Sequence, residues 1–430
     1  MYVPQDTQGE RRRVNPISHQ ALPGAGQLKF ETIERYQEKF LIKTTMKMAM
    51  AILGAVAMGH ASADVKIGFL ATLSGPSAEN GIDQLDGFNL AVEQLGGLLG
   101  GEKVIVVKED DQLKPEIAIA SVTKLLDRDK VDVVTGLTFA NIFMALQGKI
   151  GATDVPFIGS VAGPSPTAGA QCKPNLFVTS WQSDGPAEAM GKYMEDKGLK
   201  RISTFTPNFV GGKDKIAGLK RFYKGQISDE MYTPLNQLDF SAELTQVSAN
   251  KPDAIFAFYV GGLAPSFVRQ YQQMGLLGKV PLYTTNTLEG AAIDVMGSAA
   301  NGLLVADAWT PGMNNPQSKQ FVAAYEKKYG RMPSSFAAYS YDTGMLLDAA
   351  IRSANGKVDN RKAFAKAIAT AQFKSVRGDF RFGKNNYPVQ DYHVFQIWKE
   401  GNRQRTEFKL VAEGILKGHA DAFAPQCPLK

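Results

Sequence analysis

Apolar and polar positions follow two rhythms along residues 64–430, and together they predict strands that are each followed by a helix. The run from Val65 to Leu70 is apolar and ends at the turn-forming Leu73-Ser74-Gly75-Pro76. Beyond this turn, apolar side chains recur three or four positions apart until Gly96-Gly97, which predicts an amphipathic helix; the stripe consists of Ile82, Leu85, Phe88, Val92 and Leu95. A buried strand, a polar loop and a helix form the opening unit of a parallel α/β sheet.

The same alternation continues and then restarts near the middle of the chain. Its first part predicts strands at 104–107, 131–134 and 156–158 with helices at 115–128 and 141–150. Its second part predicts strands at 202–205, 253–259, 281–284 and 303–306 with helices at 211–224 and 263–275. Helices at 314–329, 336–353 and about 360–371 follow, and 392–398 alternates like an antiparallel strand. We therefore predict an α/β protein with two doubly wound, Rossmann-like lobes.

The length of this region agrees with two lobes, because it exceeds the usual size of a single hydrophobic core. We expect the chain to cross first between the lobes near 180–183. The first lobe would comprise 64–182 and about 313–375, and the second 183–312 and about 376–430. Two lobes joined by several strands describe a hinge-bending clamp.

The segment before residue 64 resembles an export signal. Residues 43–63 hold two lysines, an apolar run from Met48 to Met58 and the cleavage pattern Ala61-Ser62-Ala63. The apolar run is too short to span a bilayer, which takes about 20 residues. We expect cleavage after Ala63 and a periplasmic protein, and we interpret residues 1–42 as a non-native or disordered extension.

Composition argues against most enzyme classes. Beyond residue 63 only His393 and His419 remain, and the sequence has no metal-ligating Cys or His spacing. The motifs G-x-G-x-x-G and G-x-S-x-G are absent, and Val210-Gly211-Gly212-Lys213-Asp214 lacks the residues of a phosphate loop. We expect no enzymatic activity and no cofactor. The small net charge of +3 for 64–430 gives no basic face, so we expect no nucleic-acid partner.

The two cysteines, Cys172 and Cys427, indicate one disulfide if the protein is exported. Two free buried thiols are the alternative.

The candidate binding site consists of loops that follow the predicted strands. These loops are rich in hydroxyls, glycines and aromatic side chains. Hydroxyls and backbone N–H groups can hold a carboxylate, and aromatic rings can enclose an apolar ligand. Ordinary packing is the alternative for each single aromatic residue. The candidate residues are Ser74, Thr138, Phe139, Asn141, Ser160, Val161, Ala162, Trp181, Asn208, Phe209, Tyr259, Gly261, Asn286, Glu289 and Trp309.

Two carboxylates are candidates to face the cleft, Asp184 and Glu289. Either could bind an ammonium group there. Taken alone, each is more often an ordinary charge at a helix N-terminus.

Several motifs resemble the extracellular ligand-binding receptors of type I periplasmic fold, such as the leucine/isoleucine/valine-binding protein. They are KIGFLATLSGP, DGFNLAV, VDVVTG, CKPNLFVTSWQ, the FVxxYEKKYGRxP stretch and SVRGDFRF, and they span essentially 64–430. The resemblance implies a clamp with a three-strand hinge that delivers a small molecule to an ABC permease and ATPase complex in the inner membrane. We expect the protein itself to be a monomer.

The resemblance also implies where a ligand carboxylate would bind. In the amino-acid binders, strand-end hydroxyls and N–H groups of the first lobe hold it, which corresponds here to 138–141 and 160–162. Gly163 stands where those binders often have threonine. The C-x-P-x-x-F and T-S-W-Q elements are more similar to the branch that binds aromatic carboxylates. Glu289 corresponds to the ammonium-binding acid, which keeps branched-chain amino acids as an alternative, and the resemblance supports a Cys172–Cys427 disulfide.

Three functions follow as hypotheses. The first is a periplasmic binding protein for an aromatic or branched apolar carboxylate. The second is a subunit that presents its ligand state to a membrane receptor. The third, an exported hydrolase, would have to use one of the two late histidines.

Overall fold

The first sheet is built almost entirely from the first third of the described chain. The computed structural model describes residues 64–398 and 406–429, so the predicted extension (1–42) and signal segment (43–63) lie outside it. The sheet has the strand order β2-β3-β1-β4-β5-β6 and is parallel except for the β2–β3 hairpin. Its strands are β1 (Val65–Ala71), β2 (Leu98–Leu99), β3 (Glu102–Asp110), β4 (Val133–Gly136), β5 (Phe157–Gly159) and β6 (Leu176–Val178).

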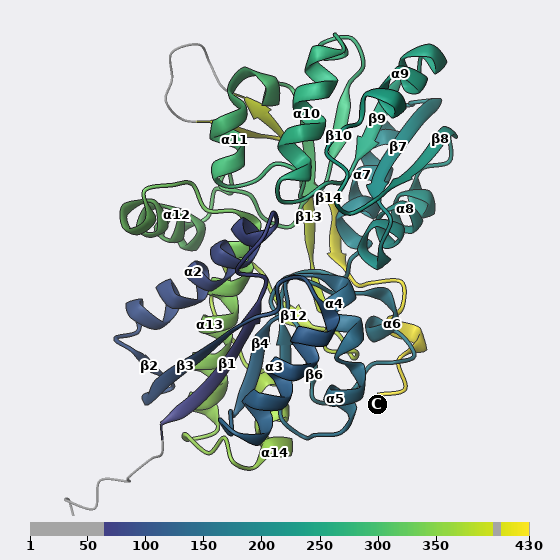
Figure 1. Ribbon diagram of the computed structural model, residues 1–430. Coiled ribbons are helices and arrows are strands. Elements are labelled where there is room, and N and C mark those ends of the chain that lie inside the picture. The colour runs from purple at the N-terminus through teal and green to yellow at the C-terminus, as the bar shows by residue number, and fades with distance from the viewer. Residues whose placement is uncertain (1–63, 399–405, 430) are drawn as a thin grey trace, which may run out of the picture. The chain divides into compact units, whose positions relative to one another are not determined.

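Helices cover both faces of this sheet, and they come from two distant parts of the sequence. One face packs against α2 (Ala78–Gln94) together with the late helices α13 (Ser335–Ser353) and α14 (Arg361–Thr370). The other face packs against the early helices α3 (Pro115–Asp127), α4 (Ala140–Ala145) and α5 (Gln147–Gly151) (Figure 1). The short helix α6 (Ser165–Ala168) follows β5, and α12 (Pro316–Tyr329) precedes α13.

The second sheet has the order β12-β13-β11-β10-β9-β7-β8, and β14 pairs with β13. Its parallel strands are β7 (Arg201–Pro207), β8 (Gln226–Thr233), β9 (Ala254–Ala257), β10 (Leu282–Thr284) and β11 (Leu304–Asp307). The strands β12 (Arg381–Phe382), β13 (Pro388–Trp398) and β14 (Glu407–His419) add an antiparallel edge. Its helices are α7 (Gly185–Asp196), α8 (Val210–Phe222), α9 (Ser241–Asn250), α10 (Leu263–Gln273), α11 (Ala291–Met296) and the 3-10 turn Gly297–Ala300. The 3-10 turn Ala424–Gln426, near the C-terminus, lies beside α6 (Figure 1).

Three connections join the two sheets, as predicted for a three-strand hinge. Residues 179–184 lead from β6 to α7, and residues 308–315 lead from β11 to α12. Residues 371–387 lead from α14 of the first lobe, through the short strand β12, to β13. In the third connection Asn386 still accepts a hydrogen bond from the N–H of Val178 at the end of β6, 3.0 Å away. The prediction of two α/β lobes is therefore confirmed.

The buried face of α2 differs from the predicted stripe. Ile82 is 41% exposed, whereas Gln84, Leu85 and Phe88 are buried. The reason is close backbone packing: a Cβ at Gly87 would lie 2.0 Å from the carbonyl oxygen of Ala337 in α13. The helix turns its glycines toward its neighbours, and this rotates Ile82 toward solvent.

The disulfide between Cys172 and Cys427 is present, with the two Cα atoms 5.7 Å apart. It fastens the end of the chain, which we assigned to the second lobe, to the segment that follows α6. The side-chain amide of Asn385 supports the same junction by donating to the carbonyl of Ala168 and to Asp421, both at 2.8 Å. None of the helices in 64–398 and 406–429 is long and apolar enough to cross a membrane.

Candidate functional site

A pocket lies where the loops of the two sheets meet, with about 420 Å³ of space between its atoms, part of which is open to solvent. Its lining is mainly apolar and aromatic and comes from both lobes. The lining residues are Thr138, Phe139, Ala140, Val161, Ala162, Trp181, Ser183, Phe209, Gly211, Lys215, Phe258, Val260, Asn286 and Phe336.

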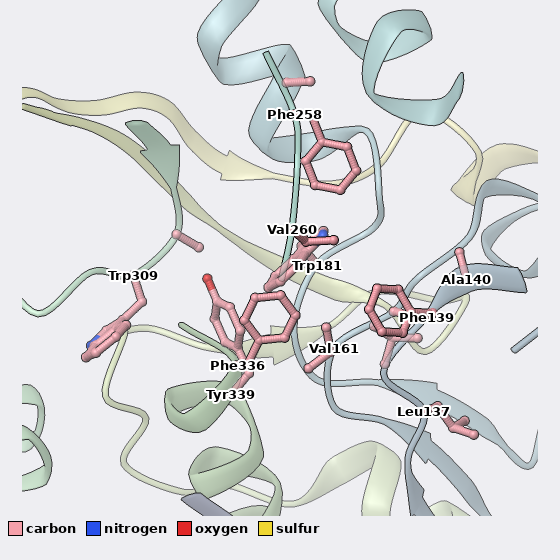
Figure 2. Packing of buried hydrophobic residues seen from close by; sticks show 14 of the residues in the cluster. Leu137, Phe139, Ala140, Val161, Trp181, Phe258, Val260, Trp309, Phe336 and Tyr339 are labelled. Atoms are coloured by element: carbon pink, nitrogen blue, oxygen red, sulfur yellow. The ribbon is translucent and has the colours of Figure 1, made fainter. Parts of the chain in front are cut away.

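The first lobe supplies one wall through the loops that follow β4 and β5. Phe139 and Val161 come from these loops, and Phe336 comes from the first turn of α13. Trp181 comes from the first hinge connection, and its ring lies edge-on to Phe336 with centroids 6.2 Å apart. Figure 2 shows Phe139, Val161, Trp181 and Phe336 gathered around one space.

The second lobe supplies the opposite wall through the ends of β7 and β9. Phe258 and Val260 follow β9, and Phe209 precedes α8. The rings of Phe209 and Phe258 are stacked with centroids 6.3 Å apart. Figure 2 shows Phe258 above the space that the residues of the first lobe surround.

The two walls touch one another, so the clamp is closed in this structure. The N–H of Gly262 in the second lobe donates to the carbonyl of Pro76 in the first lobe, with N and O 3.2 Å apart. The N–H of Ser165 reaches across to the carboxylate of Asp214 at 3.2 Å. A ligand held in this cavity is therefore enclosed by both lobes.

The hydroxyls that we predicted for the ligand carboxylate are already bonded within the first lobe. The Thr138 hydroxyl donates to Gln84 Oε1 at 2.7 Å and accepts from the N–H of Thr72. The Ser160 hydroxyl accepts from Gln84 Nε2 at 2.7 Å and lies 3.3 Å from both the Gly136 carbonyl and the Ser340 hydroxyl. Buried Gln84 thus ties β4 and β5 to α2.

Lys215 brings a positive charge into the aromatic cavity. It lies in α8, is only 2% exposed, and donates from Nζ to Asn286 Oδ1 at 3.1 Å. The ammonium nitrogen lies 5.4 Å from the ring centre of Trp181 and 5.2 Å from that of Phe258, within the range of cation–π contacts. Burial lowers the pKa of Lys215 to about 8, although nearby carboxylates, of which Asp307 acts most strongly, oppose this shift.

Two carboxylates lie behind Asn286, outside the lining of the cavity. Asn286 Nδ2 donates to Asp307 Oδ2 at 2.5 Å and to Glu289 Oε1 at 3.2 Å. Asp307 also accepts from the Tyr339 hydroxyl at 2.5 Å, and Glu289 accepts from the N–H of Ser335 at 2.6 Å. Burial raises the pKa of both carboxyl groups, and the charge of Asp307 raises that of Glu289 further.

The structure brings seven of the fifteen predicted ligand-binding residues to the cavity, namely Thr138, Phe139, Val161, Ala162, Trp181, Phe209 and Asn286. Among the others, Tyr259 packs in the core of the second lobe against Phe240 and Phe267. Trp309 is fully buried and donates from Nε1 to the Ser318 hydroxyl at 2.9 Å, and Figure 2 shows it apart from the cavity.

The remaining predicted residues also lie outside the lining. Ser74 and Asn208 are exposed, and Asn141 is half-buried at the start of α4. Gly261 has φ +57° and lies against Ser77 of the first lobe. Asp184 is fully buried, and its carboxylate pairs with Arg221 and accepts from the Ser165 hydroxyl and from Gln182 Nε2 at 3.0 Å.

Several lining residues were not predicted. Lys215 lies on a helix, and VGGKDK resembles an ordinary solvent-facing turn, so nothing in the local pattern distinguishes Lys215 from Lys213. Phe336 was also missed, because it lies in the first turn of a helix and not in a loop that follows a strand. Phe258 and Val260 flank the predicted Tyr259, and the alternation of side chains after β9 points these two toward the cavity.

Comparisons with known proteins agree with this architecture. Residues 64–402 match the family described as periplasmic binding protein. Leu/Ile/Val-binding protein homolog 6 of Brucella abortus is 24% identical over 340 residues, which cover 77% of this chain and 86% of that protein. Leu/Ile/Val-binding protein BraC3 of Rhizobium johnstonii is 25% identical, with 84% of this chain and 98% of that protein covered.

Solved structures show the same fold. An ABC transporter solute-binding protein from R. palustris, in complex with benzoate, has a TM-score of 0.80 at 29% identity and covers 85% of this chain and 100% of its own. A leucine-binding protein from Thermotoga maritima has a TM-score of 0.71 at 23% identity, covering 81% and 99%. The chain therefore belongs to the periplasmic binding protein family, with the type I arrangement of two α/β lobes that serves as the solute-binding component of ABC importers.

Proposed function

We propose that this protein captures a small aromatic carboxylate in the periplasm by closing its two lobes around the ligand, and delivers it to an ABC permease. The observation that carries this proposal is the pocket between the lobes, whose walls include the rings of Phe139, Trp181, Phe209, Phe258 and Phe336. Flat rings on several sides suit a flat ligand, because offset and edge-to-face contacts stabilise aromatic pairs. A ligand that touches both walls favours the closed state over the open one.

The comparisons support the same ligand class. Solute-binding proteins similar in fold were solved with benzoate, with 3,4-dihydroxybenzoic acid and with 4-hydroxybenzoate. The benzoate complex is 29% identical to this chain.

Branched-chain amino acids are the second candidate, because relatives are named Leu/Ile/Val-binding proteins and Glu289 is buried close to the cavity. An α-amino acid needs an acceptor for its ammonium group. Glu289 and Asp307 lie behind Asn286 and are bonded to it, so a ligand in this cavity meets the amide before either carboxylate. This arrangement favours an aromatic or other apolar carboxylate without an amino group.

A thermal-shift panel tests the function. Bound ligand should raise Tm by several degrees at concentrations about 100 times Kd. We expect this shift with benzoate, hydroxybenzoates or cinnamates, and none with leucine, isoleucine or valine. A shift with the amino acids alone would favour the second candidate. Tyr259→Phe is a suitable control variant, because Tyr259 lies in the core of the second lobe. This substitution should leave the ligand-induced rise in Tm unchanged.

The export route and the lobe boundaries are part of this proposal. We propose cleavage after Ala63, which N-terminal sequencing of the periplasmic protein would check. The lobes would comprise 64–182 with about 313–375, and 183–312 with about 376–430, and they would rotate about the three connections as a monomer. An intact N-terminus upstream of Ala63 in the periplasmic fraction would contradict the cleavage.

A further inference from the structure

We infer that the ligand carboxylate binds to Lys215 in the second lobe, and that Lys215 determines the preference for anionic ligands. This inference rests on the proposed function and deepens it, because it names the group that reads the charge. It also reverses the expected orientation, in which hydroxyls of the first lobe hold the carboxylate.

The Lys215 ammonium group has fewer hydrogen-bond partners than it has donors. An ammonium group has three N–H donors, and one of them reaches Asn286 Oδ1 at 3.1 Å. Within 64–398 and 406–429, no carboxylate oxygen lies at ion-pair distance from Lys215 Nζ. Two donors therefore remain for the space that the aromatic rings enclose.

Leaving the buried Lys215 ammonium group without an anionic partner costs free energy. Burying an ammonium group without a counter-charge is unfavourable, and a partner at hydrogen-bond distance offsets much of that cost. Four carboxylates near Lys215 are held elsewhere. Asp307 and Glu289 are bonded to Asn286, Asp184 is paired with Arg221, and Asp214 accepts from the N–H of Ser165. A ligand carboxylate is thus the anion that completes the site when the lobes close.

The side chains of the first lobe provide few free hydrogen-bond donors for a carboxylate. The hydroxyls of Thr138 and Ser160 are bonded to Gln84 at 2.7 Å. The rest of that wall is apolar, with Phe139, Val161 and Phe336 facing the cavity. A benzoate with its carboxylate toward Lys215 and Asn286 places its ring against this apolar wall.

The same geometry discriminates against α-amino acids. Their ammonium group is attached next to the carboxylate, so an amino acid bound through Lys215 would bring a second cation close to Nζ. Like charges at such short distances disfavour each other, most of all when buried. A neutral analogue such as benzamide fits the rings but lacks the charge.

The test compares the ratio of the affinities for a charged and a neutral ligand, and not one affinity alone. Kd is measured by titration calorimetry for benzoate and benzamide in the wild-type protein, in Lys215→Met and in Lys213→Met. Methionine keeps the length and apolar body of lysine without its charge. Lys213 lies in the same helix but is exposed, so its variant is the matched control.

We expect the wild-type protein and Lys213→Met to bind benzoate at least about 30-fold more tightly than benzamide. In Lys215→Met, benzoate should lose about 100-fold in affinity while benzamide changes less than about threefold, so that the ratio falls to near one. A residue with a purely structural role would weaken both ligands alike.

The possible failures are distinguishable. If the wild-type protein binds benzoate or a hydroxybenzoate and Lys215→Met keeps the preference over the amide, the role of Lys215 is overturned and the proposed function stands. If the wild-type protein binds no aromatic carboxylate at all, the proposed function is overturned and this inference with it. If Lys215→Met does not fold, equal affinity of the wild-type protein for benzoate and benzamide would still overturn the inference.

Discussion

At the scale of single residues, the site consists of the Lys215 ammonium group next to aromatic rings, with two carboxylates bonded to the side-chain amide of Asn286. Asn286 separates these groups, because its oxygen accepts from Lys215 and its nitrogen donates to Asp307 and Glu289. These partners fix the orientation of the Asn286 side-chain amide. The cavity presents a cation to a ligand, although it lies close to two acids.

The buried acids predict how stability depends on pH. The raised pKa of Glu289 means that the folded protein keeps a proton that the unfolded chain loses above about pH 4.5. Stability from this group is therefore complete at low pH and falls as pH rises through the raised pKa. The Tm of the ligand-free wild-type protein, relative to that of Glu289→Gln, should fall by about 2 °C or more between pH 5 and pH 8.

Glu116→Gln is the control for this measurement, since Glu116 is exposed in the first turn of α3. Its Tm should run parallel to the wild-type curve over the same range. If the Tm difference between Glu289→Gln and the wild-type protein stays constant from pH 5 to pH 8, Glu289 does not have the raised pKa that its burial predicts.

At the scale of elements, the close contact of α2 and α13 builds the first lobe around two helices from opposite ends of the chain. Gly87 permits this contact, because a Cβ there would lie 2.0 Å from the carbonyl oxygen of Ala337. Phe336, next to that contact, lines the cavity. The packing of these helices therefore positions one wall of the site.

Gly87→Ala should destabilise the protein by about 3 kcal/mol, because the methyl group meets backbone that cannot yield without moving a helix. Chemical denaturation measures this change. Gly148→Ala is the matched control, since a Cβ at that position of α5 meets no atom within 4 Å. Equal stability of Gly87→Ala and Gly148→Ala would contradict the described helix contact.

Much of the element pattern was readable in the sequence, and the reasons for the exceptions are physical. The apolar runs before Gly136 and Gly159 predicted β4 and β5 because strands buried on both faces have few polar residues. The strand β8 was missed because its sequence QISDEMYT alternates weakly at an edge of the sheet.

The site was only partly predictable for a related reason. Phe139, Val161 and Trp181 were predicted because they follow strand ends. Local patterns could not reveal that the Thr138 hydroxyl bonds to Gln84, which lies 54 residues earlier in the chain. Nor could they separate Tyr259, which turns into the core, from its neighbour Phe258, which turns into the cavity. Such distinctions depend on contacts between distant segments.

At the scale of the whole molecule, one buried arginine links the connections between the lobes. Arg377 Nε donates to Asp342 of α13 at 3.0 Å, and Nη1 donates to the carbonyl of Ser180 at 3.0 Å and to Gln390 Oε1 at 2.6 Å. Asn315, in the remaining connection, donates to the carbonyl of Val376 at 2.8 Å. The segment 376–377, which lies between α14 and β13, thus contacts the other two connections.

Arg377→Met should lower the free energy of unfolding by about 3 to 5 kcal/mol, because it leaves Asp342 buried without its partner. Arg381→Met removes an exposed arginine nearby and should change stability by less than about 0.5 kcal/mol. Urea denaturation of the two variants compares them directly. Similar midpoints would contradict the hinge role of Arg377.

Calorimetric titration of ligand-free protein with benzoate, 4-hydroxybenzoate and leucine measures directly whether the site binds aromatic acids. We predict saturable binding of at least one aromatic acid with a Kd of about 1 μM or tighter, which corresponds to about −8 kcal/mol, and no detectable heat with leucine. Tight binding of leucine without binding of either aromatic acid would contradict this prediction.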